Sequence, residues 1–141
     1  MLAPCTQLTV NHAIQIEYSL FFAYHSMHSF ANCDRVALRG LACYFTKEME
    51  RQAACALLWS DYQSKRGGEV HLFPVSKPEH SFEDAKGDAL CMMECKLALE
   101  RLKYSKLDKM HKVAEETNDK HFQACCSPVF MALLVCCYCC L

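Results

Sequence analysis

Glycine and proline are scarce in this sequence, and it has no excess of positive charge. Only four glycines and four prolines occur among 141 residues, so long stretches lack the residues that interrupt helices. The formal charge of −1 creates no basic field, which argues against nucleic acid as a partner. The apolar run at residues 129–141 is shorter than the roughly twenty residues of a transmembrane helix, so we predict no membrane span.

The amino terminus also lacks the pattern of a secretory signal. Its first residues, MLAPCTQLTV, contain no basic segment followed by an apolar run. Without such a signal, the twelve cysteines are expected to be reduced thiols rather than a disulfide framework. We therefore predict a cytoplasmic location. The length and the hydrophobic content of 52% are typical of one folded domain over residues 1–141.

Helical periodicity is the main structural signal. It occupies three segments, residues 6–31, 41–66 and 83–117. The second has no glycine or proline, and as a helix it would be roughly 39 Å long. Helices of that length in small domains usually lie in a bundle. The sequence therefore predicts an all-α fold of long, antiparallel neighbouring helices.

Local signals place the ends of these helices. Thr6 is the expected N-cap of the first helix, after Pro4. The pair Gly67-Gly68 should end the second. Asn118-Asp119 should break the third and cap a fourth segment, which Pro128 then interrupts.

A long connection precedes the third helix. Residues 69–87 contain two prolines and no helical period, with Val70, Leu72 and Val75 as their expected apolar anchors. About eighteen residues at roughly 3.3 Å each can run the length of a helix. We interpret the segment as the long crossover of a bundle whose middle helices run parallel.

Two glutamates interrupt the apolar stripes that should face the core. The predicted stripe of the second helix consists of Leu41, Phe45, Met49, Ala53, Ala56 and Trp59. The predicted stripe of the third consists of Leu90, Met93, Leu97, Glu100, Tyr104, Leu107, His111 and Ala114. Glu17 lies in the stripe of the first helix. Inward carboxylates from separate helices are the ligands of di-iron bundle proteins. The alternative is that each glutamate has a buried stem and a solvated head group.

Several fragments together resemble a ferritin subunit, most closely the animal heavy-chain type. They are EYSLFFAYHSM, VALRGLACYF, YQSKRGG, KPE, MECKLALE and LDKMHKVAEETNDKHF, and they span about residues 12–122. The resemblance implies a ferritin-like four-helix bundle, ferric iron storage, and assembly with other ferritin subunits into a cage, a 24-mer in the family. The fourth helix is largely missing from the pattern, because residues 123–141 diverge into an apolar, cysteine-rich tail.

The resemblance also implies a ferroxidase centre, which this sequence keeps only in part. Glu17 and Glu100 match metal-binding glutamates, and Tyr24 matches the tyrosine beside the iron pair. The Glu-x-x-His motif of the second helix is replaced by Gln52 and Cys55. A neutral bridge offsets little of the repulsion between two iron ions, so we expect iron binding to be weak and oxidation slow or absent. A thiolate at Cys55 would favour zinc or cuprous copper, and its alternative role is that of a small packed hydrophobe.

The acidic face on which ferritins nucleate mineral is also depleted. By this resemblance, Glu48 and Glu50 remain acidic, whereas Arg51, Ala54 and Leu57 stand where the family tends to have acids.

Three functions remain open from the sequence. The first is an iron-storage subunit, active or passive, within a mixed cage. The second is a truncated, inactive ferritin-derived chain. The third is a thiol-rich metal-binding or interaction protein that uses the tail, for which palmitoylation and membrane contact are weak signals.

Overall fold

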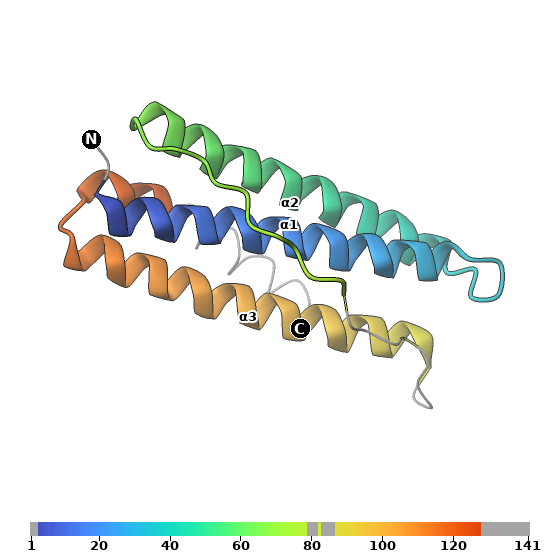
Figure 1. Ribbon diagram of the computed structural model, residues 1–141. Coiled ribbons are helices and arrows are strands. Elements are labelled where there is room, and N and C mark those ends of the chain that lie inside the picture. The colour runs from blue at the N-terminus through green and yellow to red at the C-terminus, as the bar shows by residue number, and fades with distance from the viewer. Residues whose placement is uncertain (1–2, 79–81, 83–86, 128–141) are drawn as a thin grey trace.

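The computed structural model describes residues 3–78, 82 and 87–127. Three long helices dominate it, α1 (Pro4–Asn32), α2 (Arg39–Lys65) and α3 (Asp88–Glu116), and residues 120–127 form a short fourth helix. The predicted all-α fold is confirmed, and the described residues contain no strand. Figure 1 shows the long helices lying side by side, with α1 between α2 and α3. The tail after residue 127, Pro128 included, and a helical start at residues 83–86 lie outside the described residues.

The helix boundaries follow backbone constraints more closely than side-chain caps. α1 begins at Pro4, whose fixed φ suits the first helical position. The prediction that Thr6 caps this helix is wrong, because Thr6 is buried inside it and Ala3 precedes it with extended backbone. α2 ends as predicted before Gly67, which has a φ of 71°. The amide of Gly68 then donates to the carbonyl of Gln63 at 2.9 Å and closes the helix end.

The long connection crosses the bundle along α1 (Figure 1). The side chain of Asn11 donates to the carbonyl of Glu69 at 3.3 Å and accepts the amide of His71 at 3.0 Å. Gln15 donates to the carbonyl of Pro74 at 2.9 Å. These bonds hold the crossover against α1. The prediction that Leu72 is an apolar anchor of the crossover is wrong, because 70% of the Leu72 surface is exposed.

The core is divided into two apolar clusters. The first lies toward the start of α1 and is built on Val10, Ile14, Trp59, Tyr62, Leu107, Met110, Ala114 and Phe122. The second lies toward the other end and is built on Leu20, Tyr24, Met27, Ala42, Phe45, Phe82 and Met92. Between the two clusters, the buried residues of every long helix are polar or charged, with Ala56 of α2 as the exception. This polar layer is the feature that positions the candidate site.

The core-facing stripes of α2 and α3 differ from the predicted ones. On α3, Leu90 and Tyr104 are exposed, whereas Lys96 and Lys103 are buried. On α2, Glu48 and Gln52 are buried and Met49 is only partly covered. The predicted and observed stripes agree at Phe45, Ala56, Trp59, Glu100, Leu107 and Ala114. At the other positions the buried residue is usually a neighbour of the predicted one.

Candidate metal centre

Each long helix contributes to the first half of the polar layer. Lys103 of α3 donates to Oε2 of Glu17 on α1 at 2.7 Å and to Oε1 of Gln52 on α2 at 2.7 Å. The Lys103 and Glu17 side chains are 4% and 2% exposed. A lysine ammonium can only donate, so Gln52 must present its amide oxygen to it. The three side chains form a buried ion pair with a neutral second acceptor.

The second half of the layer is centred on Lys96 of α3. Its ammonium lies 3.2 Å from Oε1 of Glu100 and 3.5 Å from Oε2 of Glu48. The hydroxyl of Tyr24 donates to the same Glu100 oxygen at 2.7 Å. Glu48 also pairs with Arg51, which lies one turn further along α2. Lys96 therefore connects carboxylates of α2 and α3, and the hydrogen bond from Tyr24 connects α1 to the same group.

Positive and negative charges in this layer balance. The buried carboxylates of Glu17, Glu48 and Glu100 face two buried ammonium groups and the guanidinium of Arg51. Buried charges are tolerated when they are paired in this way. The layer is thus electrically satisfied by the chain's own side chains.

The two glutamates respond differently to burial. Burial raises the pKa of Glu17, and the ammonium of Lys103 offsets part of that rise. Burial would also raise the pKa of Glu100, but Lys96 and the hydrogen bond from Tyr24 outweigh it, so this pKa lies below its usual value. Oε2 of Glu100 is buried and has no hydrogen-bond partner among the described residues.

Cys55 lies beside the layer as a neutral thiol. Burial raises its pKa, and the negative charge of Glu17 raises it further. A soft metal would need the thiolate, so this environment opposes the zinc or copper binding considered for Cys55. Within the part of the chain that the structure describes, no three His, Cys, Asp or Glu side chains are grouped so as to hold a metal ion.

The layer gathers most of the residues predicted for the site. Glu17 and Gln52 share Lys103, Tyr24 and Glu100 share a hydrogen bond, and Cys55 is adjacent. The prediction that these residues are metal ligands stays a prediction. Sequence reasoning missed the two lysines and the burial of Glu48, which was assigned to the cavity face.

A spacing signal for the lysines was present. On α3, Lys96, Glu100, Lys103 and Leu107 follow one another at steps of four, three and four residues, which is one helix face. Lysine is nearly always exposed, so its presence does not suggest a buried face. For that reason the charged half of the stripe was not recognised.

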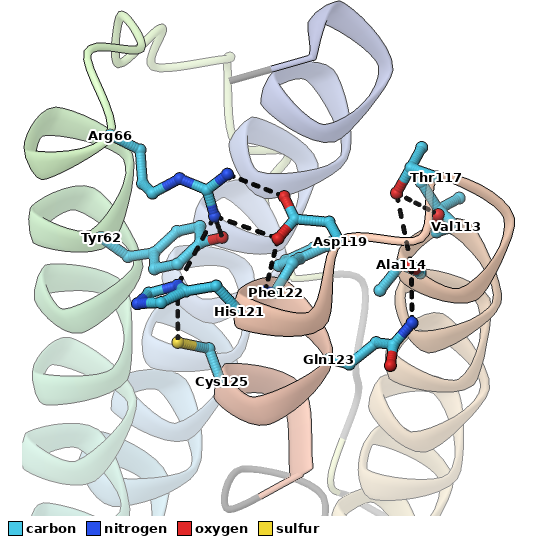
Figure 2. Close-up of polar contacts among 10 residues, drawn as sticks. All are labelled: Tyr62, Arg66, Val113, Ala114, Thr117, Asp119, His121, Phe122, Gln123 and Cys125. Carbon is cyan, nitrogen blue, oxygen red and sulfur yellow. Dashed lines mark hydrogen bonds and ion pairs between the residues drawn. The ribbon is translucent and has the colours of Figure 1, made fainter. Parts of the chain in front are cut away.

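A second polar group fixes the short fourth helix to the end of α2 (Figure 2). Arg66 makes a bidentate ion pair with Asp119, with N···O distances of 2.9 and 3.2 Å, and donates to the hydroxyl of Tyr62 at 2.8 Å. Oδ1 of Asp119 accepts the amide of Phe122 at 3.0 Å, so Asp119 caps this helix as predicted. The contact between His121 and Cys125 is long, at 3.9 Å. This group has a structural role, because it holds Phe122 against Trp59 in the core.

A helical bundle with a long crossover and carboxylates converging on its core defines the ferritin-like class. The family model for the ferritin-like domain matches residues 8–126, and the chain belongs to the ferritin family. It is 42% identical to ferritin-1 of Brassica napus over 83% of its length, and 37% identical to ferritin-3 of Arabidopsis thaliana over 92%. The crystal structure of ferritin from the green alga Ulva pertusa superposes with a TM-score of 0.93 at 32% identity, covering 96% of this chain and 71% of that one.

These relatives correct two predictions. Both plant proteins are named chloroplastic ferritins, a finding that contradicts the predicted cytoplasmic location. The family is confirmed, but plant and algal relatives do not support the narrower resemblance to animal heavy-chain subunits. The chain spans about half the length of the curated relatives, namely 46% and 50% of the two plant proteins. None of the described helices is both long and apolar enough to cross a membrane.

The side chains of the polar layer do not fit a pair of iron ions as they stand. The iron of ferritins is their cargo, and di-iron sites of this class of bundle hold it through glutamate oxygens. Here Oε2 of Glu17, Oε1 of Gln52 and Oε1 of Glu100 each accept a hydrogen bond from a lysine. Metal ligation needs the same lone pairs, so lysine and iron compete for them.

Proposed function

We propose that this chain is a passive subunit of an iron-storage ferritin. In this role it contributes helices to a multi-subunit cage, a 24-mer as in the family, and stores ferric iron that other subunits have oxidised. Membership in the ferritin family and the close superposition on an algal ferritin support the storage role. The observation that favours a passive role is the pair of buried lysines bound to Glu17, Gln52 and Glu100.

The face of α2 opposite to the core supports the same conclusion. Leu57 is 61% exposed, and Arg51 and Ala54 are also exposed. By the resemblance, acids at these positions line the storage cavity. Apolar and basic side chains there attract iron less than carboxylates do, so mineral should begin on neighbouring subunits.

This chain keeps only some of the ferroxidase residues of a heavy-chain-type subunit. Glu17, Tyr24 and Glu100 stand where a heavy-chain-type subunit has ferroxidase residues. Their partners in the core are lysines, and the bridging position is the neutral Gln52. We infer that intrinsic oxidation of Fe(II) by this chain is slow or absent.

Co-expression with a full-length plant ferritin tests the proposal. The two chains carry different tags, and the particle captured through this chain is measured by size-exclusion chromatography with light scattering. A cage-sized particle that contains both chains is expected. An unrelated tagged protein of similar size serves as the control and should not enter the cage. Recovery of this chain only as a monomer or a heterogeneous aggregate would contradict the storage role.

Iron kinetics on the mixed cage separate a passive from an active subunit. The initial rate of Fe(II) oxidation should scale with the number of full-length subunits and be independent of the number of copies of this chain. The total iron stored per cage should be retained. A rate that rises with copies of this chain would show that its own centre oxidises iron.

We also propose a plastid location, because the curated relatives are named chloroplastic. Fractionation of source cells, followed by detection of the chain with a specific antibody, tests it. Recovery with the cytosolic marker would contradict it.

A further inference from the structure

A groove separate from the polar layer lies between α1 and α3, two helices that Figure 1 shows side by side. Its volume is about 410 Å³, which is within the roughly 300 to 1,000 Å³ of small-molecule pockets. None of the described residues that line it takes part in the ion pairs of Lys96 and Lys103. The groove is therefore independent of the candidate metal centre.

The floor of the groove is apolar and firmly packed. Ala13 of α1 and Met110 of α3 are each 3% exposed and belong to the first core cluster. Ile16 and Val113 line the groove beside them and are partly buried. An apolar molecule bound on this floor would remove its own surface and that of these side chains from water, which is favourable in proportion to the area buried.

The rim of the groove is positively charged. Lys106 and Lys109 of α3 are exposed there, and so is His12 of α1. Within the part of the chain that the structure describes, neither lysine has an ion-pair partner, whereas Lys112 of the same helix lies 2.8 Å from Asp108. No described residue of the groove lining is acidic. A groove with charge of one sign on low-dielectric walls attracts a ligand of the opposite charge, here an anion.

The uncharged donors of the lining are already in use. The hydroxyl of Thr9 donates to the carbonyl of Cys5 at 2.7 Å, and the side-chain amide of Gln15 donates to the carbonyl of Pro74 at 2.9 Å. A ligand with acceptor atoms therefore meets the ammonium groups of the two lysines, which can only donate. Charge-assisted bonds to a carboxylate are the strongest that such groups make.

We propose that this groove binds an amphipathic monocarboxylate, a small molecule with an aliphatic chain and one carboxylate group. The chain lies on the floor formed by Ala13, Ile16 and Met110, and the carboxylate accepts hydrogen bonds from Lys106 and Lys109. The volume suits one small molecule, because a stable protein partner would bury roughly 800 Å² on each side. This site goes beyond the proposed function and depends on neither iron nor cage assembly.

Isothermal titration calorimetry of the full-length chain with decanoate, below its micelle concentration, tests the proposal. Butyrate is the matched ligand that keeps the carboxylate and loses most of the chain. Contact with the floor is measured by the methyl NMR signal of Met110, which is assigned with Met110→Leu. The titration is repeated at about 20 mM and about 500 mM NaCl, because salt screens exposed charges.

The charge of the rim is tested by Lys106→Met/Lys109→Met, which keeps the length of both side chains. The control Lys65→Met/Lys120→Met removes two exposed lysines that do not line the groove. Circular dichroism checks that both variants keep the helical signal of the native chain. The Met110 signal and the salt dependence are measured on the native sequence, so a folding defect in a variant does not affect them.

One saturable decanoate site that shifts the Met110 signal is expected. Its Kd should rise about fivefold in Lys106→Met/Lys109→Met and stay unchanged in the control. High salt should weaken binding by about threefold in the native chain and have no effect in the rim variant. Butyrate should show no binding, because each lost CH₂ group reduces affinity by about fourfold.

Three results would overturn the proposal. The first is the absence of saturable decanoate binding to the native chain. The second is equal affinity in the native chain and the rim variant, or binding that leaves the Met110 signal unmoved, because decanoate would then lie elsewhere. The third is a dimer of the chain that excludes decanoate and dissociates in the rim variant, because a second copy would then occupy the groove.

Discussion

Removal of the Lys103 ammonium should destabilise the bundle strongly, even when the replacement side chain is of similar size. In Lys103→Met the side chain keeps a similar length, but Glu17 and Gln52 lose their shared donor. The pair is almost completely buried, with exposures of 4% and 2%, so solvent cannot replace the lost contact. Leaving one partner of a buried ion pair alone typically costs about 3 to 5 kcal/mol. That is a large fraction of the roughly 5 to 15 kcal/mol by which domains are stable.

Urea denaturation followed by circular dichroism at pH 7 measures this effect. With a slope of about 2 kcal/mol per molar, Cm should fall by roughly 1.5 to 2.5 M. Native and variant proteins must be compared in the same oligomeric state and at the same concentration. The control Lys112→Met changes a lysine of the same helix that is 64% exposed and should leave Cm unchanged.

A second substitution identifies the cause. Adding Glu17→Gln to Lys103→Met replaces the stranded carboxylate with a neutral amide. The double variant should regain about 2 kcal/mol relative to Lys103→Met. A loss below about 1 kcal/mol in Lys103→Met, or no recovery in the double variant, would refute the buried ion pair as a determinant of stability.

Three further predictions concern other parts of the chain. Asp119→Asn keeps the helix cap but removes the charge, and it should cost about 1 kcal/mol at pH 7. The hydrogen bond from Arg66 lowers the pKa of Asp119 below its usual value, so this stability is present at neutral pH and is lost as the pH falls through the folded pKa. A stability difference in urea melts that grows as the pH is lowered would contradict this. Burial raises the pKa of Cys126 to about 12, so iodoacetamide at pH 8 should modify the exposed Cys43 well before Cys126. Peptide mass spectrometry measures the two rates, and equal rates would argue against the burial of Cys126. Gln52→Glu combined with Cys55→His should not restore fast Fe(II) oxidation, because both buried lysines remain; a normal ferroxidase rate in a stopped-flow assay would show that they are no obstacle.

The helical bundle was predictable because the sequence marks its boundaries with rare residues. The C-terminal end of α2 follows from the glycine pair after it, and the crossover follows from two prolines and a missing helical period. The start of α1 was predicted less well, because Thr6 matched a capping preference that the fixed backbone of Pro4 made unnecessary.

The site was predicted only in its acidic half, for a physical reason. A glutamate inside an apolar stripe stands out, so Glu17 and Glu100 were identified. Lys96 and Lys103 were not, because lysine is expected at the surface and each lies next to apolar residues that offer an alternative stripe. Their burial depends on carboxylates from other helices, a tertiary property that helical periodicity alone does not contain.

The location of the protein was beyond what composition could decide. A basic segment followed by an apolar run is a signal for secretion alone. It does not separate the cytosol from an organelle, and the chloroplastic names of the relatives corrected the prediction.

Anomalous diffraction at the iron edge, from crystals of the chain soaked in Fe(II), tests the central claim most directly. The account predicts no iron peak among Glu17, Glu48 and Glu100, and electron density for the Lys96 and Lys103 side chains against those carboxylates. An iron peak coordinated by these glutamates, with the lysines displaced, would contradict it.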